Sequence, residues 1–497
     1  MRMSELLRRL QRLAADESGA VLIYVTLLMP VVVGIGVLAV DFSRLANLNT
    51  ALQKGADALA LAGAAELDRK PTSITRANAA IANILTNKSK FSTTGLTTVT
   101  SAGQGIRYLS SLPASDTTAI TNANVTTDPL AARYVEVTVT TKTLNTILPA
   151  SLLGGANITT TSARAVAGFT SALCKTVPMF ICNPYEGNGT SLFNALNSAS
   201  DRRRQIKLQL GNIGGEAQYF PGNYGWLDTP TLGTGANALR DALATKAPNS
   251  CYIQDGVSQK TGNITNANDA LNVRFDLWAG PFNNSDNNPS YPPAVNVRKG
   301  YMPAKGAKGA CNPSVAPNVA PSTTNNGRLG RDSAFTDAGG RLGSGNWDYD
   351  GYWTANYGTM AKPASLVGYS NANLPSRYDV YRAEIGTIGT GGATDLVAHA
   401  NANNERGSAM CYSGSTPTDT PDRRVLYVAI IDCQNLNVHG NTVAPLPVMA
   451  FGKFFVTEPI SNPPDADAGT IFAELIGLSE PGSVSNEVAH DIVQLYR

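Results

Sequence analysis

A long uncharged segment near the N-terminus limits which folds are open to this chain. From Ala20 to Val40 the chain has 21 consecutive residues without a charged side chain, and Asp41 ends this run. As an α-helix, such a run extends about 31 Å, which matches the roughly 30 Å hydrocarbon core of a bilayer. The run therefore predicts a membrane-spanning helix at residues 20–40.

The charges on either side of this helix predict its orientation. Four arginines precede the run, and Arg44 and Lys54 are the nearest basic residues that follow it. Because basic flanks stay on the cytoplasmic side, residues 1–19 are expected to form a cytoplasmic arm and the bulk of the chain to lie across the membrane. Within the run, Gly34 and Gly36 are expected to let another apolar helix approach closely.

The helix is expected to continue beyond the membrane as a rod at residues 41–70. An apolar stripe with spacings of three and four, typical of one helical face, consists of Leu45, Leu48, Leu52, Ala56 and Leu59. Two interpretations of the stripe stay open: it packs on the protein's own body, or it pairs with a helix of a partner. The continuous helical pattern favours an uncleaved anchor over its rival, a signal peptide cleaved near Ala39.

The first part of the chain also carries a combination of motifs. Gly19 opens the apolar run, Leu28-Met29-Pro30 stands in its middle, Val40-Asp41-Phe42-Ser43-Arg44 marks its exit, and an Ala-rich helical pattern follows. This ensemble resembles the N-terminal region of TadE/TadG-like proteins of Tad (tight adherence, Flp pilus) assembly systems. The later segments at residues 174–187 and 422–436 are similar to stretches of the same group.

The resemblance implies a single-pass protein of the bacterial inner membrane, with its bulk in the periplasm. It also implies a structural or scaffolding role in a Tad/Flp-type pilus assembly and secretion system, with the other assembly proteins and the membrane as partners. Processed pseudopilins of this pathway have a glutamate five residues after the processing glycine, where this chain has Tyr24. The Asp-x-Ser-x-Ser metal motif of the von Willebrand A domains that many TadG-like relatives carry is absent from the sequence.

Six cysteines follow the apolar run: Cys174, Cys182, Cys251, Cys311, Cys411 and Cys433. In an oxidising compartment an even number predicts up to three disulfides, and buried free thiols are the other interpretation. The short intervening loop makes Cys174 with Cys182 the easiest pairing. None of the six forms a CxxC pair, so a zinc site is not expected.

The rest of the chain has the pattern of an α+β protein. Residues 71–172 predict a small α+β module, and residues 173–497 predict a loop-rich body that ends in a sheet. Helical patterns stand at residues 71–91 and 235–247. Strand patterns stand at residues 133–143, 157–169, 273–278, 424–432, 447–459 and 470–478.

No motif predicts enzymatic chemistry, a metal or a cofactor. A formal charge of +2 gives no sign of a nucleic-acid partner. Two aspartate pairs, Asp348 with Asp350 and Asp465 with Asp467, lack the further oxygen ligands of a calcium loop.

Two other features leave an alternative function open. His439, near Asp432, is most simply a loop histidine. The aromatic residues at 347–357 either fill a core or present a binding face. The second of these interpretations gives the alternative function, a membrane-tethered protein that binds or hydrolyses envelope glycans.

Overall fold

A computed structural model describes residues 18–83, 87–92, 95–99, 101–113, 115, 117–139, 142–147, 158–229, 235–248, 250–262, 264, 266–301, 327–337, 339–390, 394–419, 422–461, 466–479 and 488–496. The chain divides into two compact units. The first comprises Met1–Phe169 and Val493–Arg497, and the second comprises Thr170–Ile492. Mixed helices and strands with disulfides confirm the predicted α+β class.

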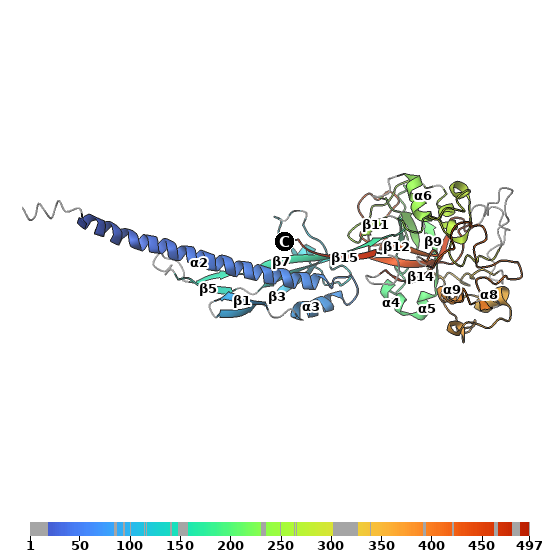
Figure 1. Ribbon diagram of the computed structural model, residues 1–497, viewed down its shortest axis with the longest axis horizontal. Coiled ribbons are helices and arrows are strands. Elements are labelled where there is room, and N and C mark those ends of the chain that lie inside the picture. The colour runs from blue at the N-terminus through green and yellow to red at the C-terminus, as the bar shows by residue number, and fades with distance from the viewer. Residues whose placement is uncertain are drawn as a thin grey trace, which may run out of the picture. The chain divides into compact units, whose positions relative to one another are not determined.

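The first unit is organised by one long helix, α2, which spans Ser18–Ala64 without interruption (Figure 1). Its 47 residues correspond to about 70 Å. Pro30 lies inside the helix. The predicted membrane helix and the predicted rod are therefore one element, although the helix ends at Ala64 and not at residue 70.

The second half of α2 packs on a small sheet. In this sheet β4 lies between β3 and β7, and both pairings are antiparallel. Alternate residues of β4, Val135, Val137 and Val139, are buried against α2 as the period-two pattern predicts. The strands are β3 (Ser101–Leu109), β4 (Tyr134–Val139) and β7 (Arg164–Cys174), of which β7 continues into the second unit.

Smaller elements complete the first unit. The helix α3 (Ser73–Asn83) buries Ala77 and Ile81 against α2, and two hairpins pair β1 with β2 and β5 with β6. They comprise β1 (Asn87–Ser92), β2 (Gly95–Val99), β5 (Lys142–Asn145) and β6 (Ile158–Thr161), and a 3-10 turn, η1, covers Asn122–Asn124. The helix predicted at residues 71–91 is thus too long, because its polar end, Asn87–Ser92, pairs in β1.

The C-terminus returns to the first unit. The last strand, β15 (Val488–Leu495), crosses the boundary between the units at Ile492. Just beyond it, the backbone N–H of Tyr496 donates to the carbonyl of Val166 at 2.8 Å, and its ring meets Tyr134 edge-on. Two segments more than 300 residues apart in sequence therefore complete one fold.

The second unit is built on a closed barrel of six strands in the order β10-β8-β12-β13-β14-β9. The β8–β12 and β9–β10 pairs are parallel and the others are antiparallel. The strands are β8 (Met179–Cys182), β9 (Gln205–Leu210), β10 (Asn223–Trp226), β12 (Val425–Ile431), β13 (Ala450–Val456) and β14 (Ile471–Leu478). The three apolar strands predicted near the C-terminus are thus confirmed and form half of this barrel.

Short helices surround the barrel and share its core. Every barrel strand contributes to that core, for example through Trp226, Val428 and Phe454. The remaining elements are α4 (Leu192–Asn197), α5 (Ala199–Arg202), α6 (Ala236–Ala244), β11 (Cys251–Ile253), α7 (Ala267–Asn272), η3 (Val273–Phe275), η4 (Gly280–Phe282), α8 (Tyr349–Tyr357), η6 (Ala364–Leu366) and α9 (Arg377–Ile385). The helix predicted at residues 235–247 is confirmed as α6, whereas the strand predicted at residues 273–278 is wrong.

A buried ion-pair network ties α9 to the barrel. The guanidinium of Arg377 is fully buried and lies 2.7 Å from a carboxylate oxygen of Glu474 on β14. Its other amino group lies 2.7 Å from Asp332. Because removal of one partner would leave a buried charge unpaired, this network fixes where α9 and the following loops sit on the barrel.

Candidate membrane-anchoring site

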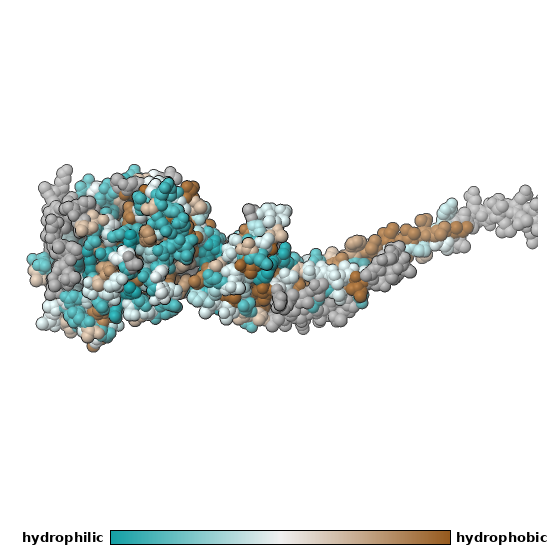
Figure 2. All heavy atoms as spheres, turned by 180° about the vertical axis from the view of Figure 1, so that it is seen from behind, coloured by the Kyte–Doolittle hydropathy of each residue, from teal (hydrophilic) through white to brown (hydrophobic). Residues whose placement is uncertain are grey.

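The apolar half of α2 is the most unusual surface of the described chain. The large apolar side chains from Ile23 to Val40 are exposed, apart from the partly buried Val37, and the most apolar stretch of the helix has a mean hydropathy of 2.5. None of that stretch is buried in the protein, and Figure 2 shows it as mostly brown. Among the described residues, α2 is the one helix long and apolar enough to cross a membrane.

The environment of α2 changes at Asp41, the first charged residue after the run. Asp41 is only 7% exposed. Its two carboxylate oxygens accept hydrogen bonds from the backbone N–H of Ile147 at 3.0 and 2.9 Å. The buried carboxylate is therefore satisfied, as a buried charge must be, and it fixes the segment after β5 to the helix.

Arg44 completes this contact one helical turn later. Its guanidinium lies 3.3 Å from Asp41 and donates to the carbonyl of Asn145 at 3.3 Å. The two charged residues of the Val-Asp-aromatic-Ser-Arg motif thus bind the same hairpin, β5–β6. The sequence analysis placed these residues in a family motif but assigned them no structural role. The feature that could have indicated such a role is a charged residue at the end of an apolar run.

The predicted stripe continues on the same face of the helix. Leu48, Leu52, Ala56 and Leu59 are buried in the core of the first unit, and Leu45 packs against that core. Their neighbours include Val135, Val137 and Ala165 of the sheet. Of the two interpretations, packing on the protein's own body is the one that the structure shows, and the assignment of these side chains to a partner helix is wrong.

Gly34 and Gly36 lie in the apolar half of α2. A methyl group built on either glycine would meet no atom within 4 Å. The fold of this chain therefore does not require glycine at either position. Their predicted role in packing against another helix stays a prediction.

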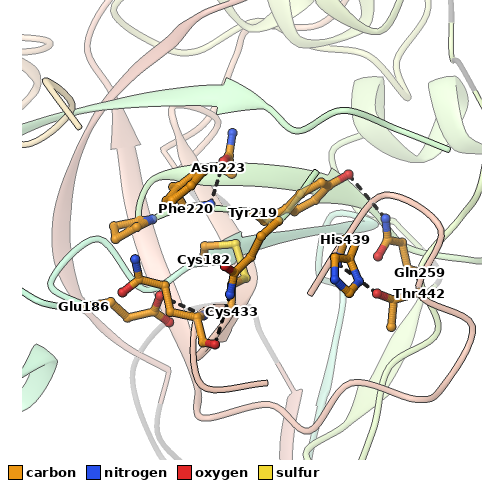
Figure 3. Close-up of a disulfide and its surroundings, with 12 residues drawn as sticks. Cys182, Glu186, Tyr219, Phe220, Asn223, Gln259, Cys433, His439 and Thr442 are labelled. Carbon is orange, nitrogen blue, oxygen red and sulfur yellow. Dashed lines mark hydrogen bonds between the residues drawn. A yellow bond between two sulfur atoms is a disulfide. The ribbon is translucent and has the colours of Figure 1, made fainter. Parts of the chain in front are cut away.

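The cysteines form disulfides in the second unit, but not by the expected pairing. Cys174 is bonded to Cys251, and Cys182 is bonded to Cys433 (Figure 3). The predicted Cys174–Cys182 bond is wrong because Cys174 pairs across β7 and β11, whereas Cys182 ends β8 beside β12. Cys411 is also disulfide-bonded, and Cys311 lies outside the described residues.

A carboxyl pair lies beside the Cys182–Cys433 bond. Burial, and then the neighbouring carboxylate of Asp432, raise the pKa of Glu186 from 4.5 to about 9. Glu186 Oε1 and Asp432 Oδ1 are both buried without a hydrogen-bond donor. The other oxygen of Glu186 accepts from the backbone N–H of Gln434 at 3.2 Å. A proton on Glu186 would therefore supply the donor that this pair lacks.

The aromatic cluster at residues 347–357 is a core and not a binding face. Trp347, Tyr349, Tyr352, Trp353 and Tyr357 are all buried, and they pack with α9 and the barrel residue Phe455. The binding-face interpretation, which supported the glycan alternative, is therefore wrong. Four of the five rings belong to the short helix α8, and they pack in one core with residues of α9 and the barrel.

The remaining polar candidates have structural roles. The Asp348 carboxylate accepts from the backbone N–H of Gly351 at 3.0 Å and caps α8. Asp467 lies 2.6 Å from the guanidinium of Arg331, while Asp465 lies outside the described residues. The backbone N–H of His439 donates to the hydroxyl of Thr442 at 2.9 Å (Figure 3). Within the described ranges, no group of three or more His, Cys, Asp or Glu side chains is placed to hold a metal.

Comparison with known proteins identifies the N-terminal segment. Residues 19–66 match the family described as putative Flp pilus-assembly TadE/G-like. The match confirms the resemblance carried by the N-terminal motifs, and it contains the apolar half of α2, Asp41, Arg44 and the buried stripe. Searches of curated proteins and of solved structures found no match to this chain.

Proposed function

Because residues 19–66 form a TadE/G-like segment, we propose that this chain is a single-pass inner-membrane component of a Tad/Flp-type pilus assembly system. Its role is structural: α2 anchors the protein, and the two units extend from the anchor as a scaffold for other assembly proteins. The role involves no catalysis. Secretion and adhesion are functions of the assembled system, to which this chain contributes its scaffold.

One observation carries the proposal: a single helix has two environments. Before Asp41 its large apolar side chains are exposed, and after Asp41 its apolar stripe is buried. Exposed apolar side chains over this length are unfavourable in water and favourable in a bilayer. The same helix therefore serves as an anchor and as the core of the first unit.

The charges and the disulfides support this orientation. Basic residues concentrate before the apolar run, which favours a cytoplasmic N-terminus. The disulfides of the second unit favour an oxidising compartment for the bulk of the chain. Both arguments support a periplasmic location for the two units.

Membrane fractionation tests the anchor. The full chain should resist extraction from membranes by alkaline carbonate, and external protease added to spheroplasts should digest the two units while sparing an N-terminal tag. The matched control is a variant with Val32→Lys and Ile35→Lys, which should fail to insert. Recovery of the wild-type chain in the soluble fraction, or of a mature product without residues 1–40, would contradict the anchor.

Substitution of the two glycines tests the scaffold. Gly34→Ile and Gly36→Ile should leave membrane insertion and the stability of the first unit unchanged, because both positions are open. We expect them to reduce co-purification with the other assembly proteins and the yield of pili. The contrasting variant, Gly63→Ile, meets Ile81 at 2.6 Å from its Cβ and should destabilise the first unit itself. Unchanged co-purification and pilus yield for both glycine variants would argue against helix packing at this surface.

A further inference from the structure

The hairpin β5–β6 runs back along α2 toward its apolar half. The contacts form a series: the side-chain amide of Gln53 donates to the carbonyl of Arg164, and Thr161 donates to Asn49, each at 3.2–3.3 Å. Arg44 then binds Asn145, and Asp41 binds Ile147. The hairpin therefore points toward the end of the apolar run, and Ile147 lies beside the first charged residue after it.

Three apolar side chains are exposed where this series ends. Phe42 is 62% exposed, and Ile147 and Ile158 are each 56% exposed. Ile158 pairs with Asn145 across the hairpin. By contrast, Leu144 of the same hairpin is buried in the core of the first unit. These three residues, which we call the exit patch, are apolar side chains that the described part of the chain leaves exposed near the end of the apolar run.

Charge at this level is low. Asp41 and Arg44, the charged residues of α2 at the exit, pair with each other. In the sequence, no charged residue occurs between Lys142, the first residue of β5, and Arg164, the first residue of β7. A surface of this kind can enter the headgroup–acyl boundary of a bilayer without carrying an unpaired charge into it.

The distance of the exit patch from the hydrocarbon core indicates that lipid covers it. Phe42 follows Val40 by two residues, or about 3 Å along the helix axis. Arg44 follows Val40 by four residues, or about 6 Å. The interfacial layer on each side of the hydrocarbon core is about 5–8 Å thick. If α2 spans the bilayer at residues 20–40, the exit patch lies within that layer.

We propose that the exit patch, Phe42, Ile147 and Ile158, inserts into the interfacial layer of the bilayer that α2 spans. This second contact would seat the first unit on the lipid and restrict the tilt of α2. The inference rests on the proposed anchor, and it adds a lipid-binding role for the β5–β6 hairpin. The Asp41–Ile147 hydrogen bonds set the depth of the patch relative to the helix.

Quenching by brominated lipids tests this proposal on the full chain in lipid bilayers. The four native tryptophans are buried in the second unit, so wild-type protein supplies a constant background. We would measure the added fluorescence of Ile147→Trp and Ile158→Trp, with lipids brominated near the carbonyl end or near the methyl end of the acyl chain. Val33→Trp reports the apolar half of α2, and Val443→Trp, at an 87% exposed position of the second unit, reports solvent.

For Ile147→Trp and Ile158→Trp we expect a loss of added fluorescence that clearly exceeds the loss for Val443→Trp. This loss should be greater with lipids brominated near the carbonyl end than with lipids brominated near the methyl end. If Val33→Trp is quenched while both hairpin variants behave like Val443→Trp, the lipid contact is overturned and the anchor stands. If Val33→Trp is not quenched, both the anchor and the lipid contact are overturned. Because the two hairpin variants lie on different strands, misfolding of one leaves the other as the test.

Discussion

Cys182, the last residue of β8, is joined by a disulfide to Cys433, which stands 251 residues later and follows β12. The two strands are parallel neighbours in the barrel, with Cys182 in register with Ile431. Parallel neighbours need a long connection, and here most of the second unit is that connection. The bond therefore closes a loop that contains every helix described in the second unit.

Removal of this disulfide should destabilise the second unit strongly. The double variant Cys182→Ala and Cys433→Ala is expected to lower its free energy of unfolding by about 3–5 kcal/mol, since closure of a longer loop removes more entropy from the unfolded chain. Cys174→Ala with Cys251→Ala, which opens a loop of 77 residues, should cost about 1 kcal/mol less. Urea unfolding followed by tryptophan fluorescence measures both.

The first unit is an internal control for this prediction. All six cysteines lie within residues 170–492, so a reducing agent should leave unfolding of the first unit unchanged. Equal urea midpoints for the wild type and the Cys182/Cys433 variant would show that the bond does not restrict the unfolded chain as expected.

Loss of the Asp41 carboxylate should release the β5–β6 hairpin. Asp41→Ala leaves the Ile147 N–H without its acceptor, which costs about 1–2 kcal/mol at this partly buried site. Amide exchange at Ile147 should then become roughly five- to thirtyfold faster. Arg44→Ala should have a smaller effect, about 0–1 kcal/mol, because its guanidinium is partly exposed. Asp41→Asn, which keeps one acceptor oxygen, should lie between them; a larger effect of Arg44→Ala than of Asp41→Ala would contradict this account.

Sequence periodicity predicted the parts of the fold that local pattern controls. The apolar run and the stripe predicted a continuous helix, and the alternating valines of β4 predicted which face of that strand is buried. The apolar strands near the C-terminus were predictable because a strand that is buried on both of its faces is apolar along its whole length. In each of these elements the burial of a residue follows from its neighbours in sequence.

Tertiary contacts explain what the sequence could not predict. Residues 273–278 have a strand pattern, yet Asp276 adopts a left-handed conformation and its carboxylate accepts from the backbone N–H groups of Met410, Cys411 and Tyr412. Those donors stand 134 or more residues away. The prediction of the disulfide pairing failed because it also depends on distant contacts: Cys182 and Cys433 come together only through the pairing of β8 with β12. The local pattern also does not predict that Asp41 binds the backbone of Ile147, because Ile147 is 106 residues away.

A charge in the buried stripe should unfold the first unit. Leu52 has no exposed surface and lies between Leu48 and Ala56 in the core. We expect Leu52→Glu to cost at least about 3 kcal/mol, since it removes a buried leucine and buries a carboxylate. Lys54→Glu, at an exposed position of the same helix, should change stability by no more than about 0.5 kcal/mol. Limited proteolysis of the first unit measures the difference; equal resistance of the two variants would restore the partner-helix interpretation of the stripe.

The carboxyl pair beside the Cys182–Cys433 bond should make the second unit less stable as pH rises. Burial raises the pKa of Glu186 from 4.5 to about 9, so between these values the folded protein holds a proton that the unfolded chain releases. The stabilising contribution is therefore complete below about pH 4.5 and is lost as pH rises through about 9. Glu186→Gln supplies a permanent N–H donor to Asp432 and should flatten this dependence, with a gain of about 1 kcal/mol at the alkaline end after allowance for partial exposure. The matched control is Glu216→Gln, at an exposed position, which should keep the wild-type slope. Urea unfolding of the second unit from pH 5 to pH 9 measures the slopes, and a Glu186→Gln slope equal to that of the wild type would show that Glu186 does not bind the proton on which this dependence rests.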